Sequence, residues 1–512
     1  MRRLHSVLWP LCLLLAASVT AAPRVEVRGT LIDGVWSAQD ASVAEFRGVP
    51  YAQPPVGARR FRAPLPWLPE AGIRSARTFA PGCVQDDYNT RWYRQVGAYF
   101  GAAAERFADP AFSEDCLYLN IWSPHPDPSA RLPVLVWFHG GSNKAGWSFE
   151  ANYQGARLAA QGRILVVTVG YRLGVLGFLA TSDGHHVLAN AGLSDQIEAL
   201  RYVRRSIAAF GGDPARVTIA GESAGGADVL ALLAAPAARG LYARAIIESG
   251  GYSLRGGPTL GQAQAAMNLV ADAVQAHTFA ERQAVPATAL FAAATHIVPT
   301  PRYLPIVDGR SLTESVTAHL QHGLDVDVLV GSNADESLLY VDDREDSLQR
   351  MVDALPASVQ TELGAWAREA GSARAAQNRL GSFLDMGCSA QVVAAAVKPS
   401  HRAYLYRFTR VRSGAAQAGL GAYHGAEIPY VFDTHDDWLP TAAVDRALGE
   451  HMLSAWAAFV ASGDPNRPGR VNWPAYRRDA PQALEWGDTV RVIEAPDHAR
   501  CDRVASALYP LN

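Results

Sequence analysis

Lysine and long hydrophobic runs are scarce in this sequence. Lys144 and Lys398 are the only lysines, and no block of positive charge occurs along the chain. With 46 basic and 49 acidic side chains the formal net charge is −3, so we expect neither nucleic acid nor an anionic membrane as a main partner. Beyond the first residues no apolar run is long enough to span a bilayer, and no stable membrane anchor is expected. These absences favour a small molecule as the partner and leave the oligomeric state open.

Repeats and low-complexity linkers are also absent. The 512 residues are 49% hydrophobic and 19% charged, which is an ordinary globular composition. A chain of this size buries a core without a metal or a disulfide to hold it together. Two adjacent histidines, His185 and His186, have only Asp183 nearby and no further ligand at a suitable spacing. We therefore expect no metal and no cofactor.

The first residues predict an exported protein. Arg2 and Arg3 precede an apolar stretch at residues 7–17, and small residues follow at 18–22. This order is typical of a secretory signal peptide, whereas a buried N-terminal helix would not need the charges or the small residues. We predict a signal peptide at residues 1–21 and a single mature domain at residues 22–512, in the periplasm or the medium.

Four cysteines remain after this cleavage: Cys83, Cys116, Cys388 and Cys501. An even number in an exported protein suggests disulfides. Four cysteines allow three connectivities, of which the sequence-local one joins Cys83 to Cys116 and Cys388 to Cys501.

Short β-branched runs alternate with helical patterns along the chain. We expect buried strands at residues 134–138, 164–169, 217–220, 245–248 and 326–330. Between two of them, apolar residues from Leu193 to Phe210 recur at spacings of three and four, which predicts an amphipathic helix. Strand, helix and strand in this order indicate an α/β fold with a large, mostly parallel central sheet and helices on both faces. Ligand sites in such sheets lie at the carboxyl ends of the strands.

The strand at residues 217–220 is followed by a nucleophile motif. Gly221-Glu222-Ser223-Ala224-Gly225 leads directly into an Ala- and Leu-rich helix. A tight turn between strand and helix favours glycine two places before and after the serine, whose hydroxyl is then exposed at the helix amino terminus. The pentapeptide alone is a weak indicator, but this setting makes Ser223 the candidate nucleophile.

A second loop supplies candidate oxyanion donors. The strand at residues 134–138 runs into His139-Gly140-Gly141-Ser142-Asn143, where glycines let backbone amides approach a substrate oxygen. We expect an oxyanion hole made by the amides of Gly141, Ser142 and Ala224. The alternative is an ordinary glycine turn. Taken alone the loop would favour that alternative, but the presence of the serine motif favours the oxyanion hole.

Together these motifs resemble those of the type-B carboxylesterases, the cholinesterase-like family of α/β-hydrolases. Further segments similar to the family lie at residues 46–61, 114–120, 190–196, 210–214 and 463–474. They cover nearly all of the mature chain, and residues 252–302 and 340–400 match least. The resemblance implies an α/β-hydrolase fold with a Ser, Glu, His triad in that chain order.

The resemblance also implies which residues serve as the acid and the base of the triad and which residues support them. Glu336 in Gly331-Ser332-Asn333-Ala334-Asp335-Glu336 is the implied acid, with Asp335 the less favoured choice, and His424 is the implied base. Glu222 and Ser249 match positions that support the triad, although simple packing is nearly as good an explanation. The two sequence-local cysteine pairs resemble disulfides of the family, and Arg60 with Glu114 resembles its structural ion pair. His139, which precedes the serine, is better explained as loop scaffolding.

Departures from the family pattern narrow the expected function. Ser142 replaces a usual glycine, Asn143 replaces an aromatic residue, and the tryptophans that cholinesterases use are missing near Phe107 and Tyr252, although Trp92 lies nearby. We therefore expect an exported serine carboxylesterase that hydrolyses short-chain or aryl esters through an acyl-enzyme. A lipase of the same fold and a non-catalytic adhesion or binding module are the alternatives.

Overall fold

The computed structural model describes residues 21–297, 302–414 and 419–509; the predicted signal peptide lies almost entirely outside these residues. Its centre is an eleven-stranded sheet with the strand order β18-β17-β16-β15-β14-β13-β9-β10-β8-β4-β3. All neighbours from β10 to β17 run parallel, and the strands at both edges are antiparallel. In chain order the strands are β3 (Val35–Trp36), β4 (Ala44–Pro50), β8 (Tyr118–Ser123), β9 (Leu132–Phe138), β10 (Leu165–Val169), β13 (Gly212–Glu222), β14 (Arg244–Glu248), β15 (Asp327–Asn333), β16 (Ala403–Phe408), β17 (Gln482–Trp486) and β18 (Val490–Glu494).

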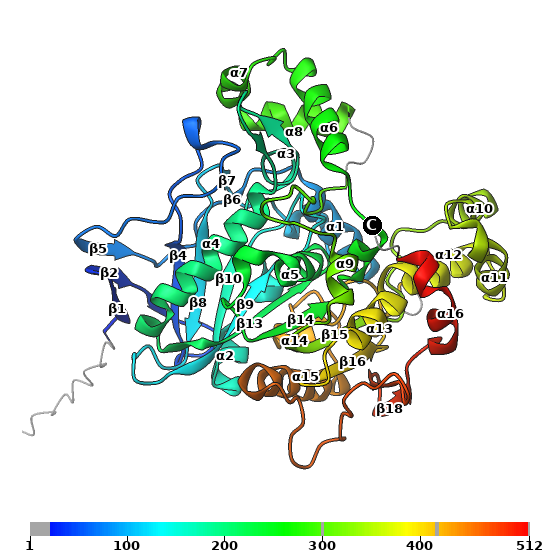
Figure 1. The fold of residues 1–512 in the computed structure, drawn as a ribbon. Coiled ribbons are helices and arrows are strands. Elements are labelled where there is room, and N and C mark those ends of the chain that lie inside the picture. The colour runs from blue at the N-terminus through cyan, green and yellow to red at the C-terminus, as the bar shows by residue number, and fades with distance from the viewer. Residues whose placement is uncertain (1–20, 298–301, 415–418, 510–512) are drawn as a thin grey trace, which may run out of the picture.

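The five predicted strands correspond to β9, β10, β13, β14 and β15, which are neighbours in the middle of this sheet. Their apolar runs are continuous because both faces of the sheet are covered by helices. Alternate residues of β9 enter two separate cores, with Val134 and Val136 in one and Leu135 and Trp137 in the other. The sheet is therefore the middle layer of three, as Figure 1 shows.

Helices of different sequence regions cover the two faces. The core on one face includes α4 (Ala191–Ser206) and α5 (Ala224–Ala234), and Leu193 and Ile197 of α4 point into it as the spacing predicts. The core on the other face includes α2 (Ala156–Gly162) and α15 (Ala443–Ser462). The α/β-hydrolase class expected from the sequence is confirmed by this arrangement.

Two groups of helices lie outside the three layers (Figure 1). One contains α6 (Leu260–Ala273), α7 (Phe279–Ala284) and α8 (Ala287–Ile297), and the other contains α10 (Glu345–Asp353), α11 (Ala357–Arg368) and α12 (Ala373–Gly381). Both come from the segments that resemble the family least. Within the described ranges, no helix combines the length and apolar character needed to cross a membrane.

Two disulfides and a buried ion pair connect distant segments. Cys83 is bonded to Cys116, and Cys388 in α13 (Cys388–Ala395) is bonded to Cys501 in α16 (His498–Leu508). These are the pairs that the resemblance implies. Arg60 donates from Nε to Glu114 at 2.7 Å.

Candidate active site

Ser223 lies at the turn between β13 and α5, with a backbone conformation of φ 55° and ψ −122°. The turn depends on its flanking glycines, because a Cβ on Gly221 would lie 2.4 Å from the carbonyl carbon of Gly225 and one on Gly225 would lie 2.0 Å from the oxygen of Phe138. A serine in this sparsely populated conformation persists only where the surrounding structure enforces it. The predicted turn therefore holds Ser223 in place at the carboxyl end of the sheet.

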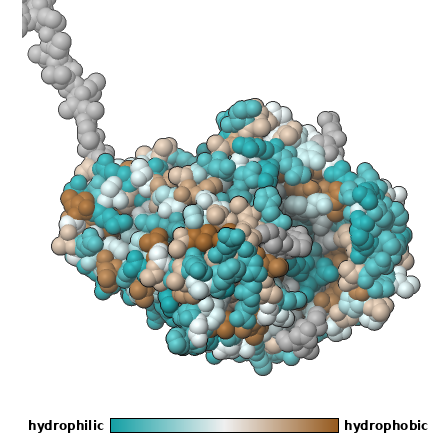
Figure 2. Space-filling model, turned by 90° about the horizontal axis from the view of Figure 1, so that it is seen from above, coloured by the Kyte–Doolittle hydropathy of each residue, from teal (hydrophilic) through white to brown (hydrophobic). Residues whose placement is uncertain are grey.

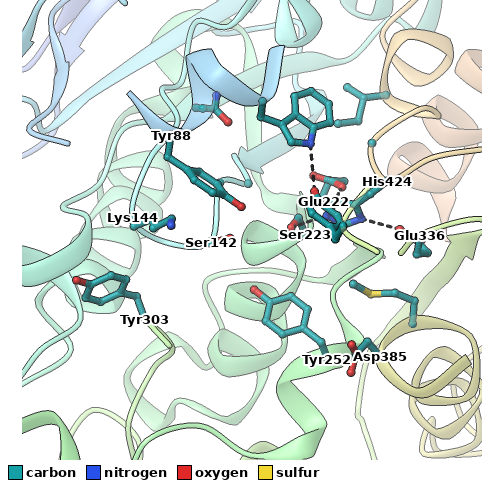
Figure 3. Close-up of a pocket in the computed structure, with 18 of the residues that line it drawn as sticks. Tyr88, Ser142, Lys144, Glu222, Ser223, Tyr252, Tyr303, Glu336, Asp385 and His424 are labelled. Carbon is teal, nitrogen blue, oxygen red and sulfur yellow. Dashed lines mark hydrogen bonds and ion pairs between the residues drawn. The ribbon is translucent and has the colours of Figure 1, made fainter. Parts of the chain in front are cut away.

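The structure brings the three predicted triad residues together. The Nε2 atom of His424 lies 2.8 Å from the Oγ atom of Ser223, and its Nδ1 atom lies 2.6 Å from a carboxylate oxygen of Glu336. These atoms come from three loops that follow different strands, and Figure 3 shows them in line from Ser223 through His424 to Glu336. Such an arrangement lets the histidine accept the hydroxyl proton while the carboxylate orients the ring.

Glu336, rather than Asp335, faces the histidine. The Oε1 atom of Glu336 accepts hydrogen bonds from the hydroxyl of Ser249 and the amide of Asn333, both at 2.6 Å. Asp335 instead accepts from the side chain of Asn378 and the amide of Ala422, both at 2.9 Å. Glu336 is thus fixed toward the ring, while Asp335 holds the loop that carries His424.

The glycine loop after β9 passes directly over Ser223. A Cβ on Gly140 would lie 3.1 Å from the Cβ of Ser223, and a Cβ on Gly141 would lie 2.2 Å from the oxygen of Ala145. Within the described ranges, the backbone amides of Gly141, Ser142 and Ala224 donate to no protein acceptor. Three free amides beside a serine hydroxyl can bind a developing oxyanion.

Ser142 adopts the left-handed backbone conformation that the family's glycine suggests, with φ 58°. A left-handed conformation costs a non-glycine residue about 1–2 kcal/mol. The next residue, Asn143, is also left-handed (φ 54°) but is fully buried. Its side-chain amide donates to Asp228 of α5 at 2.9 Å, and its oxygen accepts from the hydroxyl of Tyr171 at 3.2 Å. These contacts hold the strained loop against α5, the helix that follows Ser223.

His139 is part of this support. Its ring is buried and stacks on Tyr171 with the ring centroids 4.5 Å apart, and its Nδ1 atom lies 2.8 Å from the oxygen of Gly140. Burial lowers the pKa of His139 to about 4, so its ring is neutral.

A second carboxylate lies close to the histidine. The Oε1 atom of Glu222 lies 3.3 Å from the Nε2 atom of His424. Burial raises the pKa of Glu222 to about 8. Burial by itself would lower the pKa of His424, but the carboxylates of Glu222 and Glu336 outweigh burial and raise that pKa. The site therefore favours the imidazolium that forms when His424 takes a proton.

A cavity of about 440 Å³ opens above Ser223. The sequence did not predict most of its lining, which is rich in aromatic side chains. Trp92 of α1 (Tyr88–Tyr99) donates from its indole to the hydroxyl of Tyr340 at 3.1 Å, and the Tyr340 ring lies 6.2 Å from the ring of His424. Further lining residues are Tyr88, Lys144, Tyr252, Arg302 and Tyr303. Several belong to the segments of least resemblance, so no motif marked them.

The fold and the site together define an α/β-hydrolase with a nucleophile, a histidine and an acid in that chain order. The model of the carboxylesterase family matches residues 21–504, and the chain belongs to this family. It is an ester hydrolase of the serine hydrolase class.

Curated relatives match over nearly their whole length. The chain is 32% identical to the para-nitrobenzyl esterase of Bacillus subtilis (strain 168) over 497 residues, covering 92% of this chain and 95% of the relative. It is 31% identical to the phenmedipham hydrolase of Pseudarthrobacter oxydans, covering 92% and 96%. It is 33% identical to the fumonisin B1 esterase of Sphingopyxis macrogoltabida, covering 90% and 86%.

Solved structures agree with the fold. A structure of PNB esterase superposes with a TM-score of 0.83 at 29% identity and covers 96% of this chain and all of that one. The Geobacillus stearothermophilus carboxylesterase EST55 superposes with a TM-score of 0.80 at 31% identity, covering 94% and 99%.

Proposed function

We propose that this protein is an exported carboxylesterase that hydrolyses short-chain or aryl esters through an acyl-enzyme on Ser223. The observation that carries the proposal is the position of His424, which lies 2.8 Å from the Ser223 hydroxyl and 2.6 Å from the Glu336 carboxylate. In the proposed reaction His424 removes the proton as Ser223 attacks the ester carbonyl, and Glu336 stabilises the resulting imidazolium.

The amides of Gly141, Ser142 and Ala224 are the proposed oxyanion donors. His424 then protonates the departing alcohol, and the same histidine activates the water that hydrolyses the acyl-enzyme. Because Glu222 and Ser249 contact His424 and Glu336, we propose that they position the triad. No step in this reaction needs a cofactor or a metal.

Size and lining of the cavity support a small or aryl ester. A cavity of about 440 Å³ lined by aromatic rings suits a compact substrate, and the relatives include a para-nitrobenzyl esterase. A lipase would need a broad apolar rim. Of the large hydrophobic side chains that are strongly exposed in the described ranges, only Tyr340 lines the cavity. On the face that Figure 2 shows, hydrophilic and hydrophobic residues are interspersed.

Export is supported by the leader-like sequence of residues 1–21 and by the two disulfides, which persist in oxidising compartments. Cleavage after Ala21 predicts a mature protein that begins at Ala22. Intact-mass analysis of protein recovered outside the cytoplasm checks this.

The catalytic proposal is tested by labelling the purified mature protein with a fluorophosphonate and mapping the modified residue. We expect the label on Ser223. The variant Ser223→Ala should lose label and at least about three orders of magnitude in kcat with a p-nitrophenyl ester. Ser337→Ala is the matched control, because Ser337 lines the same cavity but has no bond to His424, and it should still be labelled. Full turnover by Ser223→Ala would refute the assignment.

A further inference from the structure

The cavity above Ser223 contains two basic side chains without an acidic partner. Lys144 and Arg302 both line it. The Nζ atom of Lys144 lies 3.7 Å from the centroid of the Tyr88 ring, and Arg302 donates to the oxygen of Gly256 at 3.4 Å. Neither forms an ion pair with any residue that the structure describes, and the segments outside the description contain no Asp or Glu. The two positive charges are therefore available to a ligand.

The carboxylates of the same cavity do not neutralise these charges. Glu336 is paired with His424, and Asp385 is paired with Arg255 at 2.9 Å. Glu150 accepts from the hydroxyl of Tyr93 at 2.6 Å.

Asp86 and Glu222 are the two other acids that could compensate the charge of Lys144. Asp86 exerts the main acidic influence on Lys144, but its carboxylate accepts from the backbone amide of Tyr88 at 2.9 Å instead of forming an ion pair. Glu222 lies against His424, with 3.3 Å between its Oε1 atom and the Nε2 atom of the ring. Lys144 thus forms no ion pair with an acid that the structure describes, and Asp86 compensates only part of its charge from a distance.

Lys144 stands where it can contact a bound ester. It follows the proposed oxyanion donors by two residues, and its own amide donates to the oxygen of Gly141 at 3.1 Å. Figure 3 shows Lys144 with Tyr88 and Tyr303 on the side of Ser223 opposite to Glu336. The side chain is half-buried, and burial lowers its pKa. An anion beside it would stabilise its charged form.

The position of His424 restricts how an ester can be oriented in the cavity. His424 has to protonate the departing alcohol, so the alcohol lies on the His424 side of the serine. The acyl group takes another direction from the tetrahedral carbon, and the part of the cavity lined by Lys144 offers it room away from His424.

We propose that Lys144, assisted by Arg302, selects esters whose acyl part carries a carboxylate at its far end. The favoured substrates are monoesters of dicarboxylic acids, and hydrolysis adds water across the acyl carbon–oxygen bond to release an alcohol and a dicarboxylate. This inference rests on the proposed esterase function.

Two matched pairs of substrates test the inference. In the acyl pair, monomethyl adipate is compared with methyl adipamate, which replaces the distal carboxylate by a neutral amide of similar size. In the alcohol pair, 4-acetoxybenzoate is compared with 4-acetoxybenzamide. We expect the carboxylate to raise kcat/KM by about tenfold in the acyl pair, the scale of one hydrogen bond to a charged group, and to give no gain in the alcohol pair. Salt at about 0.5 M should reduce the gain by screening.

Variants separate charge recognition from packing. Lys144→Met keeps the length of the side chain and removes its charge, so the ratio of kcat/KM within the acyl pair should fall about tenfold. Lys144→Arg should retain most of the ratio. Lys398→Met is the matched control, because Lys398 is the chain's other lysine and faces Asp325 at 3.8 Å; the ratio should be unchanged.

Each alternative result has a distinct meaning. A neutral ester that is hydrolysed as well as its carboxylate counterpart, or a carboxylate preference confined to the alcohol pair, overturns the inference and leaves the esterase function in place. Equal loss on both members of the acyl pair in Lys144→Met means that Lys144 is structural, which also overturns it. Absence of turnover on every ester in wild-type protein refutes the proposed function, and the inference falls with it.

Discussion

Glu336 and Asp335 are adjacent carboxylates, and replacing each by its amide should have very different effects on kcat. Glu336→Gln keeps the shape of a side chain that is 3% exposed and accepts from His424, Ser249 and Asn333. An amide has one acceptor oxygen, so one end of the substituted side chain has to present N–H groups either to Ser249 and Asn333 or to His424. Facing His424, the N–H groups select the wrong tautomer of the ring, and the charge that stabilises the imidazolium is lost.

We expect Glu336→Gln to lower kcat by about 10³- to 10⁴-fold, the scale of the same change in serine protease triads. Asp335→Asn should lower kcat by less than about tenfold, because Asp335 does not touch the ring. It should instead cost about 1–2 kcal/mol of stability, since one of the donors from Asn378 and Ala422 loses its acceptor.

Both variants are measured with p-nitrophenyl acetate under single-turnover conditions, together with urea unfolding to separate stability from catalysis. Fluorophosphonate labelling serves as a control that the nucleophile remains accessible. A larger loss of kcat in Asp335→Asn, or nearly full activity in Glu336→Gln, would refute the assignment of the acid.

Two predictions concern stability. Burial raises the pKa of Glu150 to about 7, so the folded state holds a proton that the unfolded state releases near pH 4.5, and stability should fall as pH rises from about 4.5 to 7. Glu150→Gln should reduce this fall by about 2–3 kcal/mol, measured by urea unfolding at both pH values; an unchanged pH dependence would contradict it. The bond between Cys388 and Cys501 closes a span of 113 residues, and replacing both by serine should cost about 2–5 kcal/mol, whereas an unchanged urea midpoint would show that the bond is not formed.

The sequence was most informative where function depends on local chain geometry. The turn around Ser223 needs glycines at fixed places because of backbone contacts within a few residues, so its pattern is visible in the sequence. The central strands were visible for a related reason, since burial on both faces of β9 and β13 requires continuous apolar runs. Edge strands such as β3 and β18 are short or partly exposed, and no pattern marked them.

The lining of the cavity could not be predicted in the same way. Trp92 and Tyr340 are 248 residues apart and meet through one hydrogen bond, and no periodicity encodes such a contact. Lys144 was noticed as one of two lysines, but its importance depends on which acids lie near it in space. Local sequence motifs therefore predict the type of reaction, whereas substrate preference depends on side chains that only the folded chain brings together.

Asn143, which stands where the family usually has an aromatic residue, belongs to a local motif but acts through a contact with a distant residue. Asn143 donates to Asp228, which lies on the same helix as the proposed oxyanion donor Ala224. Asp228 also accepts from the side chain of Gln196 on α4 at 2.6 Å. The two loops that carry the proposed oxyanion amides are thus linked by buried hydrogen bonds through Asp228. Donors fixed relative to one another before the substrate arrives need no reorganisation during the reaction, and the strain at Ser142 is a modest cost for holding them there.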